Sequence, residues 1–343
     1  MSDPLDSFFG SQPLRQEALK AISDAIDPAA HDGLMEIDVL GPALFPPGQF
    51  VMRDGSAVAV NKKGLMAAYY EVLRDVEEGR LTDGTDQASY DRASVVEGLK
   101  SLAVLTLMQP EFLLAVNMRK SLLWPKNNTP KPHGLMHLEQ RFIDSLLTSP
   151  LNKHTKSPTL WSHRRWVVLL VYRYGFSDVL DDMRVVFVAA EKHPRNYYAW
   201  NHARFLMNLV DWSSENREQH VRILNNVLDW CKRHHDDTSG WSFLQGLLLA
   251  ERRLKEADAV YVLQDVLKLA RSLRWTNESV WVFLRTIAAS RLIAEQDYKD
   301  FLQTLLAMEA STEDEAATKV LHAAAAWCEN YRETWQFKQR PFS

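Results

Sequence analysis

The fold is decided by a stretch that recurs along the chain, and its clearest copy is His193-Pro194-Arg195-Asn196-Tyr197-Tyr198-Ala199-Trp200-Asn201-His202-Ala203-Arg204. Trp200 has counterparts at Trp161, Trp241 and Trp281, and the successive spacings are 39, 41 and 40 residues. A period near 40 is longer than the about 34 residues of a tetratricopeptide repeat and is typical of paired-helix solenoids. The sequence therefore predicts stacked helical hairpins, each containing one of these tryptophans.

The surroundings of each tryptophan predict a helix start. Four positions before it stands a residue that favours helix N-termini: Ser157, Asn196, Asp237 and Asn277. These side chains can accept a hydrogen bond from the free amides of the first helical turn. Four positions after it comes Arg165, Arg204 or Arg285, with Gln245 in the remaining copy. Because i and i+4 share a helical face, we expect these arginines to brace the hairpins by hydrogen bonds or stacking.

A weaker copy of the repeat covers residues 110–120, where Val116 replaces the tryptophan and Lys120 the arginine. Amphipathic segments at 178–192, 217–234 and 257–272 follow the clearer copies, which favours a return helix in each pair. Each pair can bury its apolar side only against its neighbours. The predicted fold class is therefore all-α, an α-α superhelix in the form of a crescent-shaped solenoid of helical hairpins.

The predicted organisation has three parts. Residues 1–104 form an N-terminal region with a short β-hairpin, since residues 50–60 resemble two strands around an Asp54-Gly55 turn. Residues 65–78 and 90–108 are predicted helices, and the proline-containing stretch 124–132 is a predicted loop. The helical repeats occupy 105–310, and 311–343 form a C-terminal capping helix.

Composition excludes several classes of protein. The 343 residues are 46% hydrophobic, which is enough for a large core, and 40 basic against 44 acidic residues leave a net charge of -4. This near-balance gives no global field to attract nucleic acid or an anionic membrane. Two distant cysteines exclude a disulfide framework and favour a reducing compartment. With no signal-peptide pattern and no apolar run of about 20 residues, we expect a cytoplasmic chain without a membrane span.

The sequence predicts neither a metal site nor an autonomous active site. His133 and His137 have i, i+4 spacing but lack the zincin glutamate, and the cluster at 231–235 has no second pair of ligands. No phosphate-binding glycine loop, nucleophile elbow or pair of catalytic carboxylates stands out. His163 and His202 follow their tryptophans by two positions, on another helical face, and are predicted interface or surface groups.

The stretch 193–204 resembles the protein prenyltransferase alpha subunit repeat, whose core runs Pro-Lys-Asn-Tyr-x-x-Trp-x-His-Arg-Arg. Residues 157–165 are a second good match, and 277–285 are similar to the family's last repeat, Asn-Glu-Ser-x-Trp. Residues 1–100 do not match the usual family pattern, and no appended domain is recognisable. The chain is therefore most similar to the branch of protein prenyltransferase alpha subunit repeat-containing proteins.

The resemblance implies a particular role for one segment. In this family the alpha subunit wraps around a beta subunit that holds the catalytic zinc and most of the isoprenoid pocket. A lysine and a tyrosine of one Lys-Asn-Tyr segment lie near the isoprenoid diphosphate, and the matching residues here are Arg195 and Tyr197. Arginine keeps the charge and offers a planar fork suited to phosphate oxygens. Such a group is useful because negative charge builds on the departing diphosphate.

The functional prediction is an alpha-type subunit of a protein prenyltransferase of the geranylgeranyl type. It would act as an enzyme only with a beta subunit, the Rab-type geranylgeranyltransferase one being favoured. It would help present isoprenoid diphosphate and a protein with a C-terminal cysteine. No cofactor is predicted in this chain, since the zinc belongs to the partner. The alternative is a non-enzymatic helical-repeat scaffold, which the degenerate first and fourth repeats favour and the retained segment 195–197 disfavours.

Overall fold

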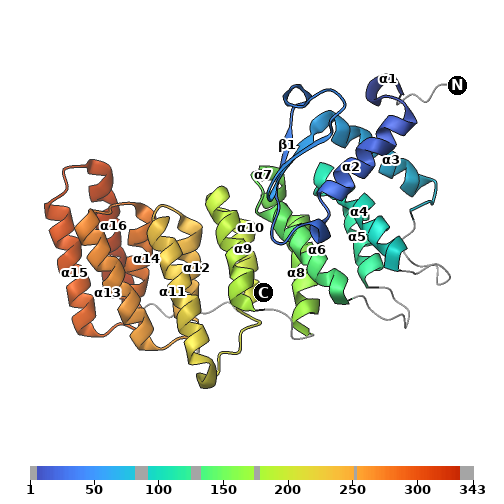
Figure 1. Cartoon of the computed structure of the whole chain (residues 1–343). Helices are drawn as coiled ribbons and strands as arrows, with labels where there is room; N and C mark the ends of the chain where they lie inside the picture. Colours follow the sequence, from blue (N-terminus) through green and yellow to red (C-terminus); the bar gives the residue numbers. More distant parts are fainter. Residues whose placement is uncertain (1–5, 82–91, 125–132, 174–177, 251–252, 333–343) are drawn as a thin grey trace. The chain divides into compact units, whose positions relative to one another are not determined.

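The structure is a computed structural model that describes residues 6–81, 92–124, 133–173, 178–250 and 253–332. The chain forms two compact units, Met1–His193 and Pro194–Ser343, which are described separately (Figure 1). Both units are dominated by helices, so the predicted all-α repeat fold is confirmed. The predicted division of the chain at residues 104 and 310 stays a prediction, and most of the predicted loop 124–132 lies outside the described residues.

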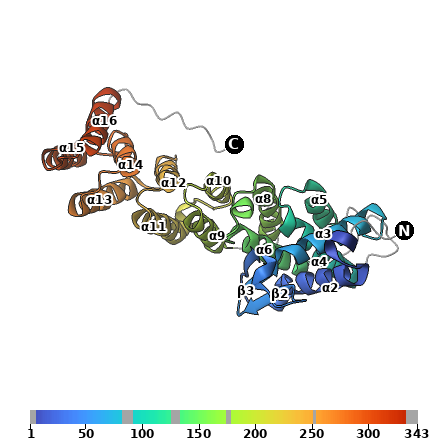
Figure 2. The ribbon, with the colours of Figure 1, turned by 90° about the horizontal axis from the view of Figure 1, so that it is seen from above.

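Unit 2 is a set of helical hairpins in two layers. Figure 2 shows α10, α12, α14 and α16 in one layer and α11, α13 and α15 in the other. Each helix of the second layer packs against the first-layer helix that follows it in the chain, α11 on α12, α13 on α14 and α15 on α16, and neighbours along the first layer also pack together. The helices are α10 (Tyr197–Leu206), η3 (Ser214–Asn216), α11 (Arg217–Arg233), α12 (Thr238–Leu249), α13 (Glu256–Leu273), α14 (Glu278–Ala288), α15 (Glu295–Ala310) and α16 (Glu315–Tyr331). The tryptophan helices thus form one layer and the return helices the other.

The tryptophans of unit 2 join one repeat to the next. Trp200 is fully buried, and its ring centroid lies 5.2 Å from that of Phe243, two residues after the next tryptophan. Trp241 lies 4.9 Å from Phe283, which has the same position one repeat later. Truncating a buried tryptophan to alanine costs about 3–5 kcal/mol of stability. The tryptophan layer is therefore the main source of cohesion between repeats.

A hydrogen bond explains why tryptophan rather than phenylalanine occupies this position. The indole nitrogen donates to the backbone carbonyl six residues earlier: Trp161 to Thr155 at 2.8 Å, Trp241 to His235 at 2.9 Å and Trp281 to Trp275 at 2.8 Å. A buried polar group without such a partner is costly. In these three repeats the bond also ties the tryptophan helix to the loop that precedes it.

Gly240 in α12 allows a close approach between repeats. A Cβ atom at this position would lie 2.5 Å from Trp230 and 3.2 Å from Trp200. Those two rings form an edge-to-face pair with centroids 4.8 Å apart, and both are fully buried. The glycine therefore makes room for an indole that an alanine would displace.

Gly240→Ala is expected to lower the free energy of unfolding by about 1–2 kcal/mol, because overpacking outweighs the helix-propensity gain of about 1 kcal/mol. Urea denaturation of the two chains measures the difference. Gly134→Ala is the matched control, since a Cβ there meets only Arg92 Nη2 at 3.9 Å. The steric explanation is wrong if both substitutions change stability in the same direction.

Unit 1 joins an N-terminal layer to the first repeat helices. Its elements are α1 (Asp6–Phe9), α2 (Gln12–Ala25), η1 (Pro28–Ala30), β1 (Glu36–Leu40), η2 (Pro42–Leu44), β2 (Val51–Asp54), β3 (Ala57–Asn61), α3 (Lys62–Glu77), α4 (Arg92–Met108), α5 (Leu113–Leu123), α6 (His133–Leu147), α7 (Asn152–Thr155), α8 (Pro158–Arg173) and α9 (Val179–Lys192). The predicted hairpin is present as β2 and β3, with Gly55 at φ 56° in its turn. Strand β1, which pairs in parallel with β3, was not predicted from the sequence.

Buried ion pairs connect the helices of unit 1. The Arg119 guanidinium of α5 contacts Glu139 of α6 at 2.9 Å, and His163 Nε2 of α8 lies 2.6 Å from the same carboxylate. Burial alone would raise the pKa of Glu139, but Arg119 and His163 lower it to about 2. Arg164, also of α8, bonds to Asp144 at 2.6 Å and to Asp182 at 2.7 Å. Removing one partner of such a pair costs about 3–5 kcal/mol.

The prediction that His163 and His202 lie on the surface or at an interface is wrong. His163 is fully buried within the Arg119–Glu139 cluster, and His202 is 4% exposed beside Phe205. The prediction took the tryptophan face as the only buried face of the helix, whereas each of these helices is covered on more than one side. The position two residues after the tryptophan is therefore a core position, as it also is at Phe243 and Phe283.

His154 makes the stability of unit 1 dependent on pH. Burial lowers its pKa to about 4, and Nε2 bonds to the Leu107 carbonyl at 2.8 Å. Because the unfolded chain takes up this proton near pH 6.5, stability falls as the pH drops from about 6.5 to about 4, by about 3 kcal/mol at most. Urea titrations at pH 7.0 and 4.5 should show a smaller pH effect in His154→Gln. An equal loss in both chains would contradict this assignment.

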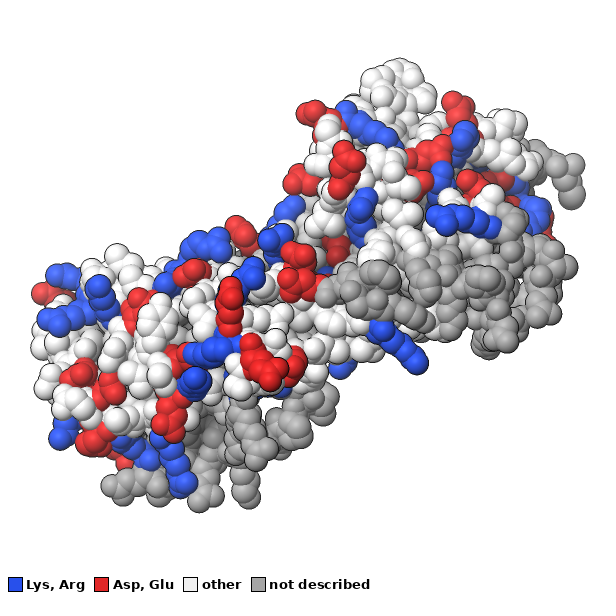
Figure 3. All heavy atoms as spheres, turned by 60° about the horizontal axis from the view of Figure 1, so that its bottom comes forward, with Lys and Arg blue, Asp and Glu red and all other residues white. Residues whose placement is uncertain are grey.

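No helix among the described residues is both long and apolar enough to cross a membrane. On the face shown in Figure 3, basic and acidic side chains are interspersed.

Candidate functional site

In each unit, the tryptophan helices carry a row of exposed or half-buried residues, three before, one after and four after the tryptophan position. We call this row the outer stripe. In unit 1 it consists of Leu113, Asn117 and Lys120 of α5 and Pro158, Ser162 and Arg165 of α8. In unit 2 it consists of Tyr197, Asn201 and Arg204 of α10, Thr238, Ser242 and Gln245 of α12, and Glu278, Val282 and Arg285 of α14. Each of these residues is exposed or half-buried, while the tryptophans behind them are buried.

The outer stripe is rich in cations at its last position. Lys120 of α5 lies over the Trp166 ring of α8, 5.7 Å from its centroid, and partial burial lowers the pKa of this lysine. Arg165 is exposed on α8. Arg204 and Arg285 hold the equivalent positions in unit 2. The stripe thus offers mainly positive and neutral groups to a partner.

The arginines of unit 2 bridge successive tryptophan helices. Arg204 lies 3.4 Å from the Ser242 hydroxyl and 5.9 Å from the centroid of the Phe243 ring, both in α12. Arg285 lies over the Trp327 ring of α16 at 4.5 Å and contacts the Ala323 carbonyl at 3.5 Å. Each of these arginines therefore lies over an aromatic ring of the next helix in the same layer rather than over the indole of its own repeat. The guanidinium groups remain half-exposed and accessible from the stripe.

Arg195 and Tyr197 lie at the N-terminal end of α10. Arg195 has φ 58° and is exposed, and its backbone amide donates to Asp237 Oδ2 at 2.7 Å. Tyr197 is the first residue of α10 and is 65% exposed, with its ring edge-on to Tyr198 at 5.7 Å. An N-terminal helix end carries partial positive charge and free amides, which favours an anion beside these two side chains. The structure shows two accessible groups there.

The predicted N-cap residues act both within a repeat and between repeats. Ser157 accepts from the Leu160 amide at 3.0 Å and donates to Glu111. Asp237 accepts from Ser239 and Gly240 in its own helix while it holds Arg195 of the previous repeat. Asn277 makes no cap hydrogen bond, and instead its amide donates to the His235 carbonyl at 2.6 Å. The cap residues were predicted from the sequence, but this ladder of contacts between successive repeats was not.

Asp237→Ala is expected to lower the free energy of unfolding by about 1–2 kcal/mol, since it removes a helix cap and the anchor of the Arg195 amide. Asp314→Ala is the matched control, because Asp314 caps α16 through the Ala316 amide at 3.1 Å and makes no side-chain hydrogen bond to an earlier repeat among the described residues. Chemical denaturation measures both. Hydrogen exchange at the amide of residue 195 should accelerate only in Asp237→Ala, and unchanged exchange would contradict the anchoring role.

The described residues contain no group of three histidine, cysteine or acidic side chains that could hold a metal ion. Cys231 is buried, and burial raises the pKa of its thiol well above the usual range. Cys328 is also buried, with its pKa raised to about 12. Both thiols are therefore protonated at neutral pH and unsuited to metal binding or nucleophilic attack.

Comparison with known proteins matches the repeat region. A family model described as the ECM9 middle domain matches residues 160–273. Protein prenyltransferase alpha subunit repeat-containing protein 1-B of Xenopus laevis is 27% identical over 200 residues, 52% of this chain and 44% of that protein. Repeat-containing protein 1 of Danio rerio is 29% identical over 180 residues, 47% of this chain and 39% of that protein.

A relative of the same kind carries an enzyme-subunit name. Geranylgeranyl transferase type-2 subunit alpha of Dictyostelium discoideum is 27% identical over 139 residues, 40% of this chain and 39% of that protein. The chain spans less than half the length of each of these curated relatives. The recurring tryptophan motif, the paired-helix architecture and these matches agree. Over its repeat region, the chain is therefore similar to proteins named for the protein prenyltransferase alpha subunit repeat.

Proposed function

We propose that the chain is an alpha-type subunit of a protein prenyltransferase of the geranylgeranyl type, and that its outer stripe binds a catalytic beta subunit. The observation that carries the proposal is the stripe itself. The same three helical positions stay exposed or half-buried in successive repeats although the helices are otherwise well covered. A solenoid uses such a repeated surface to bind an extended partner.

The chemistry of the stripe indicates what the partner surface offers. Lys120, Arg165, Arg204 and Arg285 supply cations, and the remaining stripe residues are neutral except for Glu278. An acidic or polar helical surface would complement this pattern and steer association. Half-buried arginines are also well suited to interfaces, because little further side-chain entropy is lost on binding.

Arg195 and Tyr197 would contact the isoprenoid diphosphate. Arg195 is exposed and its backbone is already fixed by Asp237, so the guanidinium would be presented from an ordered segment. Together with the N-terminus of α10 it would stabilise charge that develops on the departing diphosphate. The zinc and the attacking cysteine would come from the beta subunit and the protein substrate, with the Rab-type beta subunit favoured.

A two-part experiment tests binding and chemistry separately. Purified chain is titrated with prenyltransferase beta subunits, and transfer of labelled geranylgeranyl and farnesyl groups to a protein with a C-terminal cysteine is then measured. Arg165→Glu should weaken the heterodimer at least about tenfold, because it reverses a charge on the stripe. Arg222→Glu is the control, since Arg222 is exposed on the return helix α11.

Arg195→Gly tests the diphosphate contact without straining the fold, because φ 58° suits glycine. We expect unchanged affinity for the beta subunit, a transfer rate lowered about tenfold or more, and partial recovery in Arg195→Lys. Normal transfer by Arg195→Gly would remove this residue from the site. If the wild-type chain binds no beta subunit, the alternative of a non-enzymatic repeat scaffold is correct.

A further inference from the structure

A cavity of about 190 Å³ lies inside unit 1, away from the outer stripe. It is partly open to solvent and is lined by residues from the end of α2 and from η1, α4, α5 and α6, so it lies between the N-terminal layer and the first repeat helices. Its walls are mainly apolar and include Ile26, Val96, Leu99, Ala103, Leu135 and Phe142. Apolar cavities of about 150 Å³ hold a molecule of the size of benzene. This one therefore accommodates a single ring or a short branched chain.

The wall that η1 contributes is fixed by polar contacts. Asp27 accepts a hydrogen bond from the Ala29 amide at 2.9 Å. Arg141 of α6 donates to the His31 carbonyl at 2.7 Å and to the Pro28 carbonyl at 3.2 Å. A wall ordered in advance costs a ligand little conformational entropy, which favours binding of even a small molecule.

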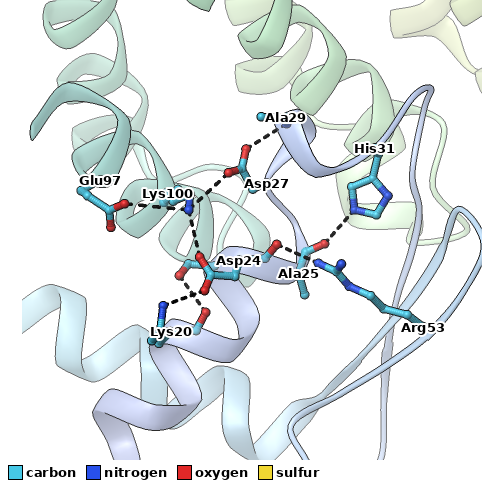
Figure 4. Close-up of polar contacts among 10 residues, drawn as sticks. Lys20, Asp24, Ala25, Asp27, Ala29, His31, Arg53, Glu97 and Lys100 are labelled. Carbon is cyan, nitrogen blue, oxygen red and sulfur yellow. Dashed lines mark hydrogen bonds and ion pairs between the residues drawn. The ribbon is translucent and has the colours of Figure 1, made fainter. Parts of the chain in front are cut away.

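Most charges around the cavity are already paired. Figure 4 shows the Lys100 ammonium between Asp24 at 2.9 Å, Asp27 at 3.3 Å and Glu97 at 3.8 Å. The hydrogen bond to Asp24 is the main reason that the pKa of Lys100 is raised. Arg119 and Glu139, which also line the cavity, pair with each other. These groups hold the walls together and leave little charge for a ligand.

Arg92 is different, because it lines the cavity, is exposed and forms no ion pair with a described residue. It is also the first residue of the 17-residue helix α4, where the helix dipole adds positive potential. An anionic group at the mouth would be attracted by both. The three carboxylates around Lys100 lie nearby and would repel a dianion such as a phosphate more strongly than a single carboxylate.

We propose that this cavity binds a small amphipathic carboxylate. The apolar body, one ring or a short branched chain, fills the space between α4 and α6, and the carboxylate lies against Arg92. Sugars and other polyhydroxylated molecules fit poorly, because the apolar walls would leave buried hydroxyls without partners. A bound ligand touches both the N-terminal layer and the repeat helices, so it stabilises unit 1.

The probe is 3-phenylpropionate, with the neutral 3-phenylpropanamide as its isostere, titrated into the full chain and followed by ligand-observed NMR. We expect saturable binding of both and about threefold to fivefold tighter binding of the acid, the range for a solvent-exposed ion pair. Arg92→Gln should lower the affinity for the acid to that for the amide, and it should leave the affinity for the amide unchanged. Arg184→Gln, on the exposed side of α9 beside Asp181 at 3.1 Å, is the control and should alter neither.

Two further variants test the apolar part of the site. Ala103→Leu fills the cavity from a buried wall, and Val96→Trp obstructs it from a half-exposed position that the fold tolerates more easily. Each substitution should weaken the binding of the acid and of the amide alike by at least tenfold, while circular dichroism confirms that the variant is folded. Absence of saturable binding, or binding that persists in folded Val96→Trp, overturns the site. Equal affinities for acid and amide that Arg92→Gln does not change overturn the carboxylate assignment.

Discussion

Contact between the tryptophan of one repeat and the aromatic ring two residues past the next tryptophan is the interaction on which the architecture of unit 2 depends. Trp200 against Phe243 and Trp241 against Phe283 set the spacing of the tryptophan helices. Once that spacing is set, the i, i+4 geometry places the arginines at the edge of the layer. The outer stripe is thus a consequence of how the indoles pack.

The period of the repeat was sufficient to predict the hairpins, because tryptophan spacing and N-cap residues are both local signals. Local signals do not indicate which neighbouring repeat a side chain contacts. Asp237 was identified as a cap, yet its second oxygen holds Arg195 of the preceding repeat. His163 and Arg164 were equally unpredictable as core residues, since their burial depends on Glu139, Asp144 and Asp182 from two other helices.

For the candidate site, the sequence predicted only that its side chains would be accessible. Arg195 and Tyr197 stand at a helix N-terminus, as the motif indicates, and both are exposed. A single sequence does not specify which side chains of other segments surround these two residues. The cavity beside Arg92 was missed for a related reason. Its walls come from α2, η1, α4, α5 and α6, and no motif in the sequence links these segments.

The ladder of cap contacts affects how local unfolding spreads through unit 2. Asp237 ties α12 to the loop before α10, and Asn277 ties the loop before α14 to the loop before α12. Each repeat therefore helps to order the loop of the repeat that precedes it in the sequence. In a quasi-one-dimensional array, stability spreads only through such neighbour terms. Fraying that begins at α16 would reach Arg195 last, whereas a break at α12 would release it directly.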